Sequence, residues 1–213
     1  MAGERGQVIR QLSGRRGGTE GNCGSLRLVY SQLMKKRILC LVAEGFEELE
    51  LVAPVDLLRR AGAEVVLASL EAELEVPGRN AMVLRADQRL DEVDPAGFDL
   101  LFVPGGPAVA RLRADGRAAE LAARLAAAGK PVAAICAAPL VLKDAGLLEG
   151  RRFTAHFSAL GELPGALTGE RVVEDGLILT SRGAGTAVEF GLALVDHLFG
   201  EAAEEEIARS IMV

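Results

Sequence analysis

The chain has 213 residues, half of them hydrophobic and only 4% aromatic, with a formal net charge of −6 and a pI near 5.1. This length supports one well-buried core, filled mainly by Leu, Val and Ala, rather than two full domains. The acidic balance argues against nucleic acid or an anionic membrane surface as the main partner, and no segment approaches the roughly 18 consecutive apolar residues of a membrane span.

Residues 1–34 differ in composition from the rest of the chain. They are rich in glycine and arginine and show no sustained hydrophobic periodicity. Because Met34 stands directly before Lys35-Lys36-Arg37 and an apolar strand, we predict that this leader is disordered or belongs to a mis-assigned start. A transit peptide is the alternative, since the leader is rich in arginine and poor in acidic residues. Residues 35–213 are predicted to form a single α/β domain.

Short apolar runs alternate with helical stretches through this domain. The runs indicate strands covered on both faces, at Ile38–Val42, Val65–Ser69, Leu100–Val103 and Val132–Ile135. Helices are predicted at Glu47–Arg60, Ala118–Ala128, Thr186–Leu198 and Glu201–Ser210. Residues 74–90 break the rhythm and predict a small β excursion at an edge. Residues 171–180 predict a hairpin that turns at Glu174-Asp175-Gly176.

The alternation of strand and helix predicts a parallel sheet with right-handed crossovers. We therefore expect a doubly wound, mostly parallel α/β sandwich. In such a sheet ligands bind at the carboxyl ends of the strands, where the loops that follow neighbouring strands meet.

The three cysteines, Cys23, Cys40 and Cys136, are widely and irregularly spaced. They form neither a disulfide framework nor the paired spacing of a zinc site, and the chain has only two histidines. We therefore predict no metal site. The cysteine usage fits a reducing compartment and hence a cytoplasmic location.

Cys136 lies where a strand passes almost at once into a helix, since Pro139 suits a first helical turn. The small residues around it permit a sharp turn, and the positive end of the helix dipole would favour thiolate. We predict that Cys136 is a nucleophile. The alternative is a buried cysteine that packs as a small hydrophobic residue, which is the prediction for Cys40 in mid-strand. Cys23, in the leader, is assigned no role.

A second strand-end turn follows the Leu100–Val103 strand, with the sequence Pro104-Gly105-Gly106-Pro107. In a doubly wound sheet this turn would lie beside Cys136. Glycines let backbone N–H groups approach a ligand closely, and together with the N–H of Ala137 they could form an oxyanion pocket. A Gly-Gly pair after a strand is, however, most often a plain turn.

Three glutamates begin the first predicted helix. Glu47 and Glu48 are expected only to complement the helix dipole. Glu50 differs, because Pro54 removes the helical donor of its carbonyl and should distort the helix there. A carboxyl group in a crevice beside a thiolate would have its pKa raised by burial and by like charge. We predict that Glu50 exchanges protons with Cys136 or with a substrate.

These features together resemble the ThiJ/PfpI superfamily of class I glutamine amidotransferase-like proteins, and most closely its Parkinson-associated deglycase branch. The likeness covers about Lys36 to Leu198. It rests on Glu-Gly-Phe-Glu-Glu-Leu-Glu (44–50) with Pro-Val-Asp-Leu-Leu-Arg-Arg-Ala-Gly (54–62), Phe-Val-Pro-Gly-Gly (102–106), Ala-Ala-Ile-Cys-Ala-Ala-Pro (133–139), Thr-Ala-His (154–156) and Asp-Gly-Leu-Ile-Leu-Thr-Ser-Arg-Gly-Ala-Gly-Thr (175–186).

The resemblance implies a flavodoxin-like fold, a homodimer and no metal or organic cofactor. It implies that Cys136 is a nucleophile and redox-sensitive thiol with Glu50 as acid partner, and it adds His156 as a nearby residue that is either catalytic or structural. Two departures exclude neighbouring branches. Ala137 stands where the protease-like branch has a histidine, and Phe157-Ser158 follow His156 where the amidotransferases have a glutamate two residues on.

The family resemblance suggests a glutathione-independent glyoxalase or deglycase acting on methylglyoxal, glyoxal or glycated proteins and nucleotides. A redox-sensing stress protein or chaperone, whose output is oxidation of Cys136, is the alternative. A non-catalytic dimeric scaffold is the third possibility.

Overall fold

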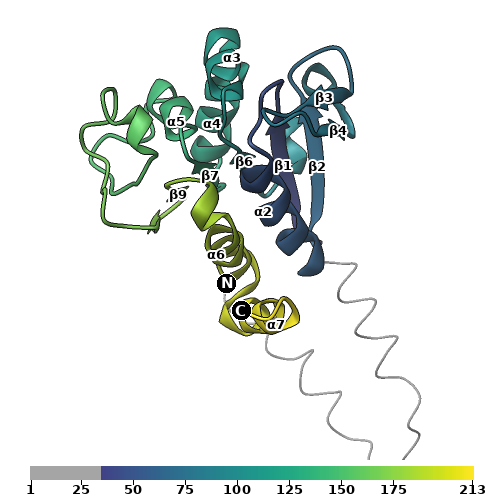
Figure 1. The fold of residues 1–213 in the computed structure, drawn as a ribbon, viewed down its shortest axis with the longest axis vertical. Coiled ribbons are helices and arrows are strands. Elements are labelled where there is room, and N and C mark those ends of the chain that lie inside the picture. The colour runs from purple at the N-terminus through teal and green to yellow at the C-terminus, as the bar shows by residue number, and fades with distance from the viewer. Residues whose placement is uncertain (1–34) are drawn as a thin grey trace, which may run out of the picture. The chain divides into compact units, whose positions relative to one another are not determined.

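The structure, a computed structural model, describes residues 35–213, which are built around a seven-stranded sheet (Figure 1). The sheet has the order β5-β2-β1-β6-β7-β9-β8. Its strands are β1 (Arg37–Val42), β2 (Glu64–Ser69), β5 (Gln88–Arg89), β6 (Leu100–Val103), β7 (Val132–Ile135), β8 (Val172–Asp175) and β9 (Ile178–Ser181). All neighbours are parallel except β8 and β9, which form an antiparallel edge.

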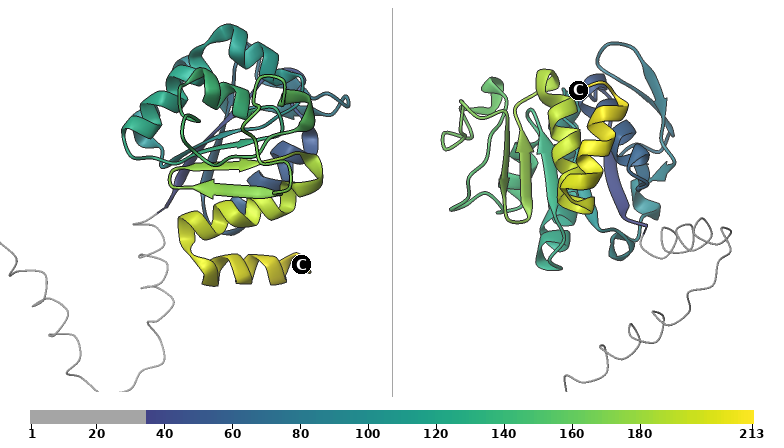
Figure 2. Two further views of the ribbon diagram at one scale, coloured as in Figure 1. Left: turned by 90° about the vertical axis from the view of Figure 1, so that its left-hand side faces the viewer. Right: turned by 90° about the horizontal axis from the view of Figure 1, so that it is seen from below.

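Helices cover both faces of this sheet, as the left-hand view of Figure 2 shows. One face carries α2 (Glu48–Arg60) and α6 (Ala187–Phe199), with α7 (Glu201–Ser210) packed outside α6. The other face carries α3 (Ala108–Asp115), α4 (Arg117–Ala127) and α5 (Pro139–Asp144). Residues of the central strand β1 from Ile38 to Val42 are at most 1% exposed, because both faces of the strand are covered.

Helices α2 and α6 cross closely at a glycine. A Cβ atom on Gly191 would lie 2.6 Å from Cδ1 of Leu57 and 2.9 Å from Cα of Pro54. Only a residue without a side chain permits this approach. The crossing fixes α2, whose first turn carries Glu50, against the rest of the fold.

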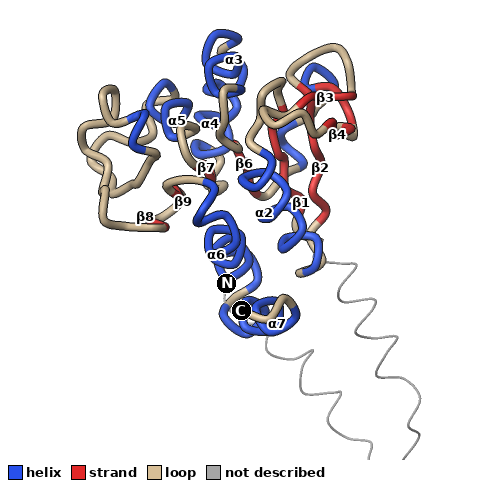
Figure 3. Tube along the Cα trace, viewed as in Figure 1, coloured by secondary structure: helices blue, strands red, loops and turns tan. Residues whose placement is uncertain are grey.

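A separate two-stranded hairpin extends from one edge of the sheet, formed by β3 (Glu75–Pro77) and β4 (Val83–Arg85) (Figure 3). Its turn returns to the start of α2, where the N–H of Gly45 donates to the carbonyl of Pro77 at 2.8 Å and Phe46 pairs with Gly78. The hairpin therefore contacts the loop that connects β1 to α2.

The predicted doubly wound, mostly parallel fold is confirmed, and so is the β excursion within residues 74–90. Two local features differ from the predictions. Helix α3 lies outside the predicted helices, because it is short and follows a Gly-Gly turn. The hairpin turn is Gly176-Leu177 rather than Glu174-Asp175-Gly176, with Gly176 at a φ of 62°. Helix α2 runs as one helix through Pro54.

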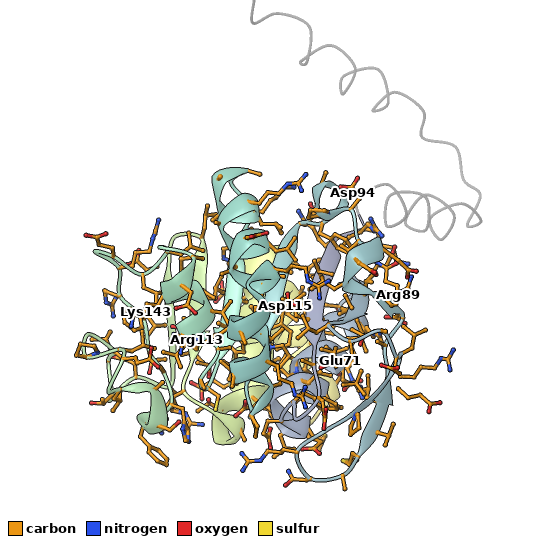
Figure 4. The ribbon with its side chains drawn as sticks, turned by 90° about the horizontal axis from the view of Figure 1, so that it is seen from above. Glu71, Arg89, Asp94, Arg113, Asp115 and Lys143 are labelled. Atoms are coloured by element: carbon orange, nitrogen blue, oxygen red, sulfur yellow. The ribbon has the colours of Figure 1, made fainter. Side chains whose placement is uncertain are left out.

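An arginine connects the long loop before β8 to helices α3 and α5. Arg113, at the end of α3, donates to Asp144 at 2.6 and 3.0 Å and to both oxygens of Glu162 at 2.9 Å; Figure 4 labels Arg113 beside Lys143. Lys143 adds a contact of 3.5 Å to Glu162. These ion pairs connect α3 and α5 to the segment that follows His156.

None of the helices in residues 35–213 is long and apolar enough to cross a membrane. The predictions made for the leader concern residues 1–34 and lie outside the described residues.

Candidate active site

Four loops meet at the carboxyl-terminal edge of the sheet, following β1, β6, β7 and β9. The N–H of Glu47, after β1, donates to the carbonyl of Gly105, after β6, at 3.2 Å. The N–H of Cys136, after β7, donates to the carbonyl of Ser181, at the end of β9, at 2.8 Å. Because the carboxyl ends of parallel strands share one edge, residues more than 130 positions apart in the chain become neighbours here.

Cys136 occupies a sharp turn between β7 and α5. Its φ is +68°, in the left-handed region that non-glycine residues rarely adopt and that costs about 1–2 kcal/mol. The turn is held on both sides, since the carbonyl of Cys136 also accepts a hydrogen bond from the N–H of His156 at 2.8 Å. Backbone strain held by surrounding hydrogen bonds is typical of functional turns. Cys136 is 8% exposed.

Gly105 brings Glu50 and Cys136 together. A Cβ atom on Gly105 would clash with Oε2 of Glu50 and would lie only 2.5 Å from Cβ of Cys136. The carboxyl group and the cysteine thus flank the same point of the backbone, separated by the space that one methyl group would fill. Any residue other than glycine at position 105 would push the two functional groups apart.

Glu50 is buried at the start of α2, with its side chain directed into this edge. Its N–H is capped by the carboxylate of Glu47 at 2.8 Å, which fixes the first helical turn. Burial raises the pKa of Glu50 from 4.5 to about 7, and the charge of Glu47 adds to the rise. The Cys136 side chain and the backbone N–H groups of Ala184 and Gly105 oppose it.

Atom Oε2 of Glu50 makes no hydrogen bond to any residue in the range 35–213. An ionised carboxylate oxygen in this setting is costly, because it is removed from water without a donor. A protonated carboxyl group can instead use this oxygen to donate toward the neighbouring sulfur. Geometry and pKa therefore agree that Glu50 holds a proton over part of the neutral pH range.

The ionisation of the Cys136 thiol depends on burial and on the neighbouring Glu50 carboxyl group. The pKa of Cys136 is raised to about 12, mainly by burial and then by the charge and carboxyl group of Glu50. The N–H groups of Gly106 and Ala137 act in the opposite direction and lower it. The prediction that the positive end of the helix dipole favours thiolate is wrong, because burial of the thiol and the nearby Glu50 carboxylate raise its pKa and α5 has only six residues. The charge of Glu50 disfavours ionisation of the neighbouring sulfur, so the protonation states of Glu50 and Cys136 are coupled.

His156 lies beside this pair but does not complete a hydrogen-bonded triad with it. Its Nδ1 accepts from the N–H of Ser158 at 3.3 Å and lies 2.8 Å from the Ser158 hydroxyl. Burial lowers the pKa of His156, and the positive charge of Arg79 lowers it further. Its ring is close to Gly183, where a Cβ atom would lie 3.3 Å from Cδ2 of His156 and 3.8 Å from Oε1 of Glu50.

A cavity of about 450 Å³ opens over the cysteine. It is lined by Glu47, Glu50, Arg79, Gly106, Pro107, Cys136, Ala137, His156, Phe157, Ser158 and Ala184. Five of the six predicted site residues line this cavity. The sixth, Gly105, lies directly beside the side chains of Glu50 and Cys136, so all six meet at one place. Within residues 35–213, no group of three or more His, Cys, Asp or Glu side chains is arranged to hold a metal ion.

The structure adds two residues that the sequence did not single out, Arg79 and Ala184. Arg79 reaches the cavity from the β3–β4 hairpin, and Ala184 from the loop after β9. No local pattern marks either one, since both depend on how distant loops pack. Cys40, by contrast, is fully buried in β1 with a pKa raised by burial, as expected for a core residue.

These features define a flavodoxin-like α/β protein with a cysteine on a strand-to-helix turn and an acidic partner. A model of the DJ-1/PfpI family matches residues 36–197, and the chain belongs to this family. The chain is 38% identical to Protein DJ-1 homolog B of Arabidopsis thaliana over 180 residues, which cover 83% of the chain and 41% of the relative. It spans less than half the length of the two Arabidopsis relatives that it matches.

Two further similarities cover nearly the whole of the other protein. The chain is 38% identical to Deglycase PfpI of Pyrococcus furiosus over 152 residues, covering 70% of the chain and 91% of the relative. The solved structure of oxidized DJ-1 from Toxoplasma gondii superimposes with a TM-score of 0.79 at 34% identity, covering 83% of this chain and 98% of that one.

The raised pKa of Glu50 predicts how stability depends on pH. Between about pH 4.5 and 7 the unfolded chain releases the Glu50 proton while the folded protein keeps it, so the free energy of unfolding falls as pH rises. Glu50→Gln removes this dependence. The difference in unfolding free energy, variant minus wild type, should therefore rise by about 1–3 kcal/mol across this window in urea titrations. Glu120→Gln, on the exposed side of α4, is the matched control, and a flat difference for Glu50→Gln would contradict the prediction.

Proposed function

We propose that the protein is a cysteine-dependent glyoxalase and deglycase that acts without glutathione. Its substrates are methylglyoxal or glyoxal and their early adducts on proteins and nucleotides, and its role is protection against carbonyl and oxidative stress. The observation that supports this most directly is the Cys136–Glu50 pair, which places a nucleophile and a proton carrier side by side in a small cavity. The relative from Pyrococcus furiosus that is named a deglycase agrees with it.

In the first step the Glu50 carboxylate takes the proton of the Cys136 thiol, and the sulfur attacks the aldehyde carbon of methylglyoxal. The C–S bond forms, the carbonyl oxygen becomes an alkoxide, and Glu50 gives it a proton, which yields a hemithioacetal. The N–H groups of Gly106 and Ala137 act on the sulfur in the free protein, and we propose that they donate to the developing oxyanion.

The Glu50 carboxylate produced by this step then acts as a base. It removes the proton from the carbon that carries sulfur, giving an enediol, and returns a proton to the neighbouring carbon. The product is a thioester of lactate, which water hydrolyses to lactate and free thiol. Methylglyoxal and one water are thus converted to lactate with no net oxidation. A carboxyl group with a pKa near 7 is suited to both directions of transfer.

An early adduct of methylglyoxal on an amine would follow the same route. The carbon that carries the amine remains at the aldehyde oxidation level, so displacement of the amine by the Cys136 sulfur gives the same hemithioacetal. The amine leaves with the proton that Glu50 took from the thiol, and lactate forms as before. His156 borders the cavity as a neutral imidazole, and we propose that it assists proton transfer at the substrate oxygen rather than at the sulfur.

The decisive test is production of lactate from methylglyoxal in the absence of glutathione. Wild-type protein should produce lactate, and Cys136→Ala should lower the rate at least 100-fold because the nucleophile is lost. Cys40→Ala is the matched control, since it removes a thiol from the core, and it should retain activity. Lactate production by Cys136→Ala at the wild-type rate would reject the mechanism.

A second function is favoured by the Glu50 carboxyl group beside the thiol, which can donate to an oxidised sulfur, and by a solved relative described as oxidized. In a redox sensor or chaperone, two molecules of peroxide would oxidise Cys136 in turn to the sulfenic and then the sulfinic acid, each releasing water. A protonated Glu50 would donate a hydrogen bond to the sulfinate oxygen. The output of such a protein is the oxidised state rather than turnover.

Mass spectrometry after mild peroxide treatment separates the two functions. The sensor requires a gain of about two oxygen atoms on the Cys136 peptide, blocked in Glu50→Leu because the proton donor is lost, together with negligible lactate production. Turnover of methylglyoxal by unoxidised protein would instead support the enzyme. Oxidation spread equally over Cys40 and Cys136 would contradict the sensor.

We also propose that the protein is a homodimer in the cytoplasm. Leu49 and Val52 are exposed on one face of α2, and Met82 and Val83 are exposed on the hairpin. The hydrogen bonds between Glu48 and Asn80 connect α2 to the hairpin, and we propose that the four exposed side chains together form the apolar patch of the dimer interface. A reducing compartment keeps Cys136 available as a thiol.

Dimer formation through this patch predicts that Leu49→Glu shifts the protein to monomer in size-exclusion chromatography with light scattering. The added charge would be buried without a partner in the interface. Met212→Glu, which changes an exposed apolar residue near the C-terminus, should leave the mass unchanged. A monomeric wild-type protein at tens of micromolar would reject the homodimer.

A further inference from the structure

Glu48 is a buried carboxylate with a defined pair of partners. Its side chain is 6% exposed, and it accepts hydrogen bonds from the N–H of Asn80 at 2.7 Å and from the side-chain amide of Asn80 at 2.9 Å. Burial acts to raise the pKa of Glu48, but the hydrogen bonds that its carboxylate accepts, chiefly those from Asn80, together outweigh burial and leave the pKa below its ordinary value. Glu48 is therefore an ionised clamp on the hairpin turn, which is more than the dipole role expected from its position in the first helical turn.

The turn that Glu48 holds packs directly on α2. A Cβ atom on Gly78 would lie 2.5 Å from Oε1 of Glu48 and 3.1 Å from Cζ of Phe46. Ala81 has a φ of +68°, which is unfavourable for a residue with a side chain. The turn thus has a local strain that the two hydrogen bonds of Glu48 offset.

Arg79 stands between Gly78 and Asn80, so the clamp fixes its backbone from both sides. Its N–H also donates to the carbonyl of Phe46 at 2.9 Å. The side chain lines the Cys136 cavity, and its charge acts on His156. None of the ion pairs among residues 35–213 includes Arg79. It is the one Lys or Arg among the residues that line this cavity.

We propose that Arg79 forms an anion-binding subsite of the Cys136 cavity and that Glu48, through Asn80, is the positioning residue that holds it there. The ligands are small carbonyl compounds that carry a carboxylate or phosphate beside the reacting carbon. The guanidinium binds the anionic group and leaves the electrophilic carbon facing the sulfur. This subsite rests on the proposed function in one respect, namely that Cys136 is the reactive group of the cavity.

The test compares alkylation of Cys136 by iodoacetate, which is anionic, and by iodoacetamide, which is neutral and of nearly the same size. Rates are followed by mass spectrometry on the Cys136 peptide of the full chain. The ratio of the two rates reports the recognition of anions, and the iodoacetamide rate reports any change in the thiol itself. No turnover is required, so the proposed enzyme activity and the subsite can fail separately.

In Arg79→Gln the iodoacetate-to-iodoacetamide ratio should fall about threefold to fivefold, the effect of one charge about 5 Å away in water. Arg79→Lys should keep most of the ratio. Arg85→Gln, an equal loss of charge on the exposed strand β4 of the same hairpin, is the matched control and should not change it. An unchanged ratio in Arg79→Gln would overturn the subsite.

The positioning role of Glu48 predicts a change in the iodoacetate-to-iodoacetamide ratio opposite to the change that loss of its charge alone would cause. Glu48→Gln removes a negative charge near the cavity, which by charge alone would raise the ratio. Loss of the clamp releases Arg79 and should lower the ratio toward that of Arg79→Gln. A ratio that is raised or unchanged would overturn the positioning role.

Asn80→Ala provides a second variant that leaves the Glu48 charge in place and removes only the side-chain hydrogen bond. It should also lower the ratio, by about twofold or more, while an unchanged ratio would contradict the clamp. Thermal melts and unchanged iodoacetamide rates in each variant establish that the fold and the thiol are intact.

Discussion

The close approach of Gly105 to Cys136 and Glu50 is the constraint on which this site depends. Two ionisable groups are held in van der Waals range of one backbone position, so neither can gain or lose a proton without affecting the other. The missing side chain makes this proximity sterically feasible. The turn of Cys136, the first turn of α2 and the loop after β9 all converge on the same point.

The fold supplies this convergence through its parallel sheet. Because β1, β6, β7 and β9 run in one direction, the loops at their carboxyl ends meet at one edge. The close crossing of α2 and α6 at Gly191 then fixes the helix that carries both Glu48 and Glu50. Those two residues lie on one helical turn yet serve different neighbours: Glu50 faces the sulfur, and Glu48 faces the hairpin.

The two glutamates differ in the hydrogen bonds that their carboxyl groups accept and in how far burial shifts their pKa. Both are buried, but Glu48 has two donors from Asn80 and stays ionised, whereas Oε2 of Glu50 has no donor in the described part of the chain. The pKa of Glu48 therefore falls and that of Glu50 rises. Two glutamates of the same helical turn thus provide a fixed negative charge at the hairpin and a carboxyl group that can exchange a proton beside Cys136.

The sequence by itself determined the alternation of strands and helices, the parallel sheet, and the meeting of Cys136, Glu50 and the Gly105-Gly106 turn at one edge. Continuous apolar runs and the rule for strand-end loops suffice for this, because both depend on local pattern and on topology. Tertiary structure alone decided the direction of the thiol pKa, the clamp by Glu48 and the entry of Arg79. These depend on side chains from distant loops packed within a few ångströms, and no local sequence pattern encodes which loops will touch.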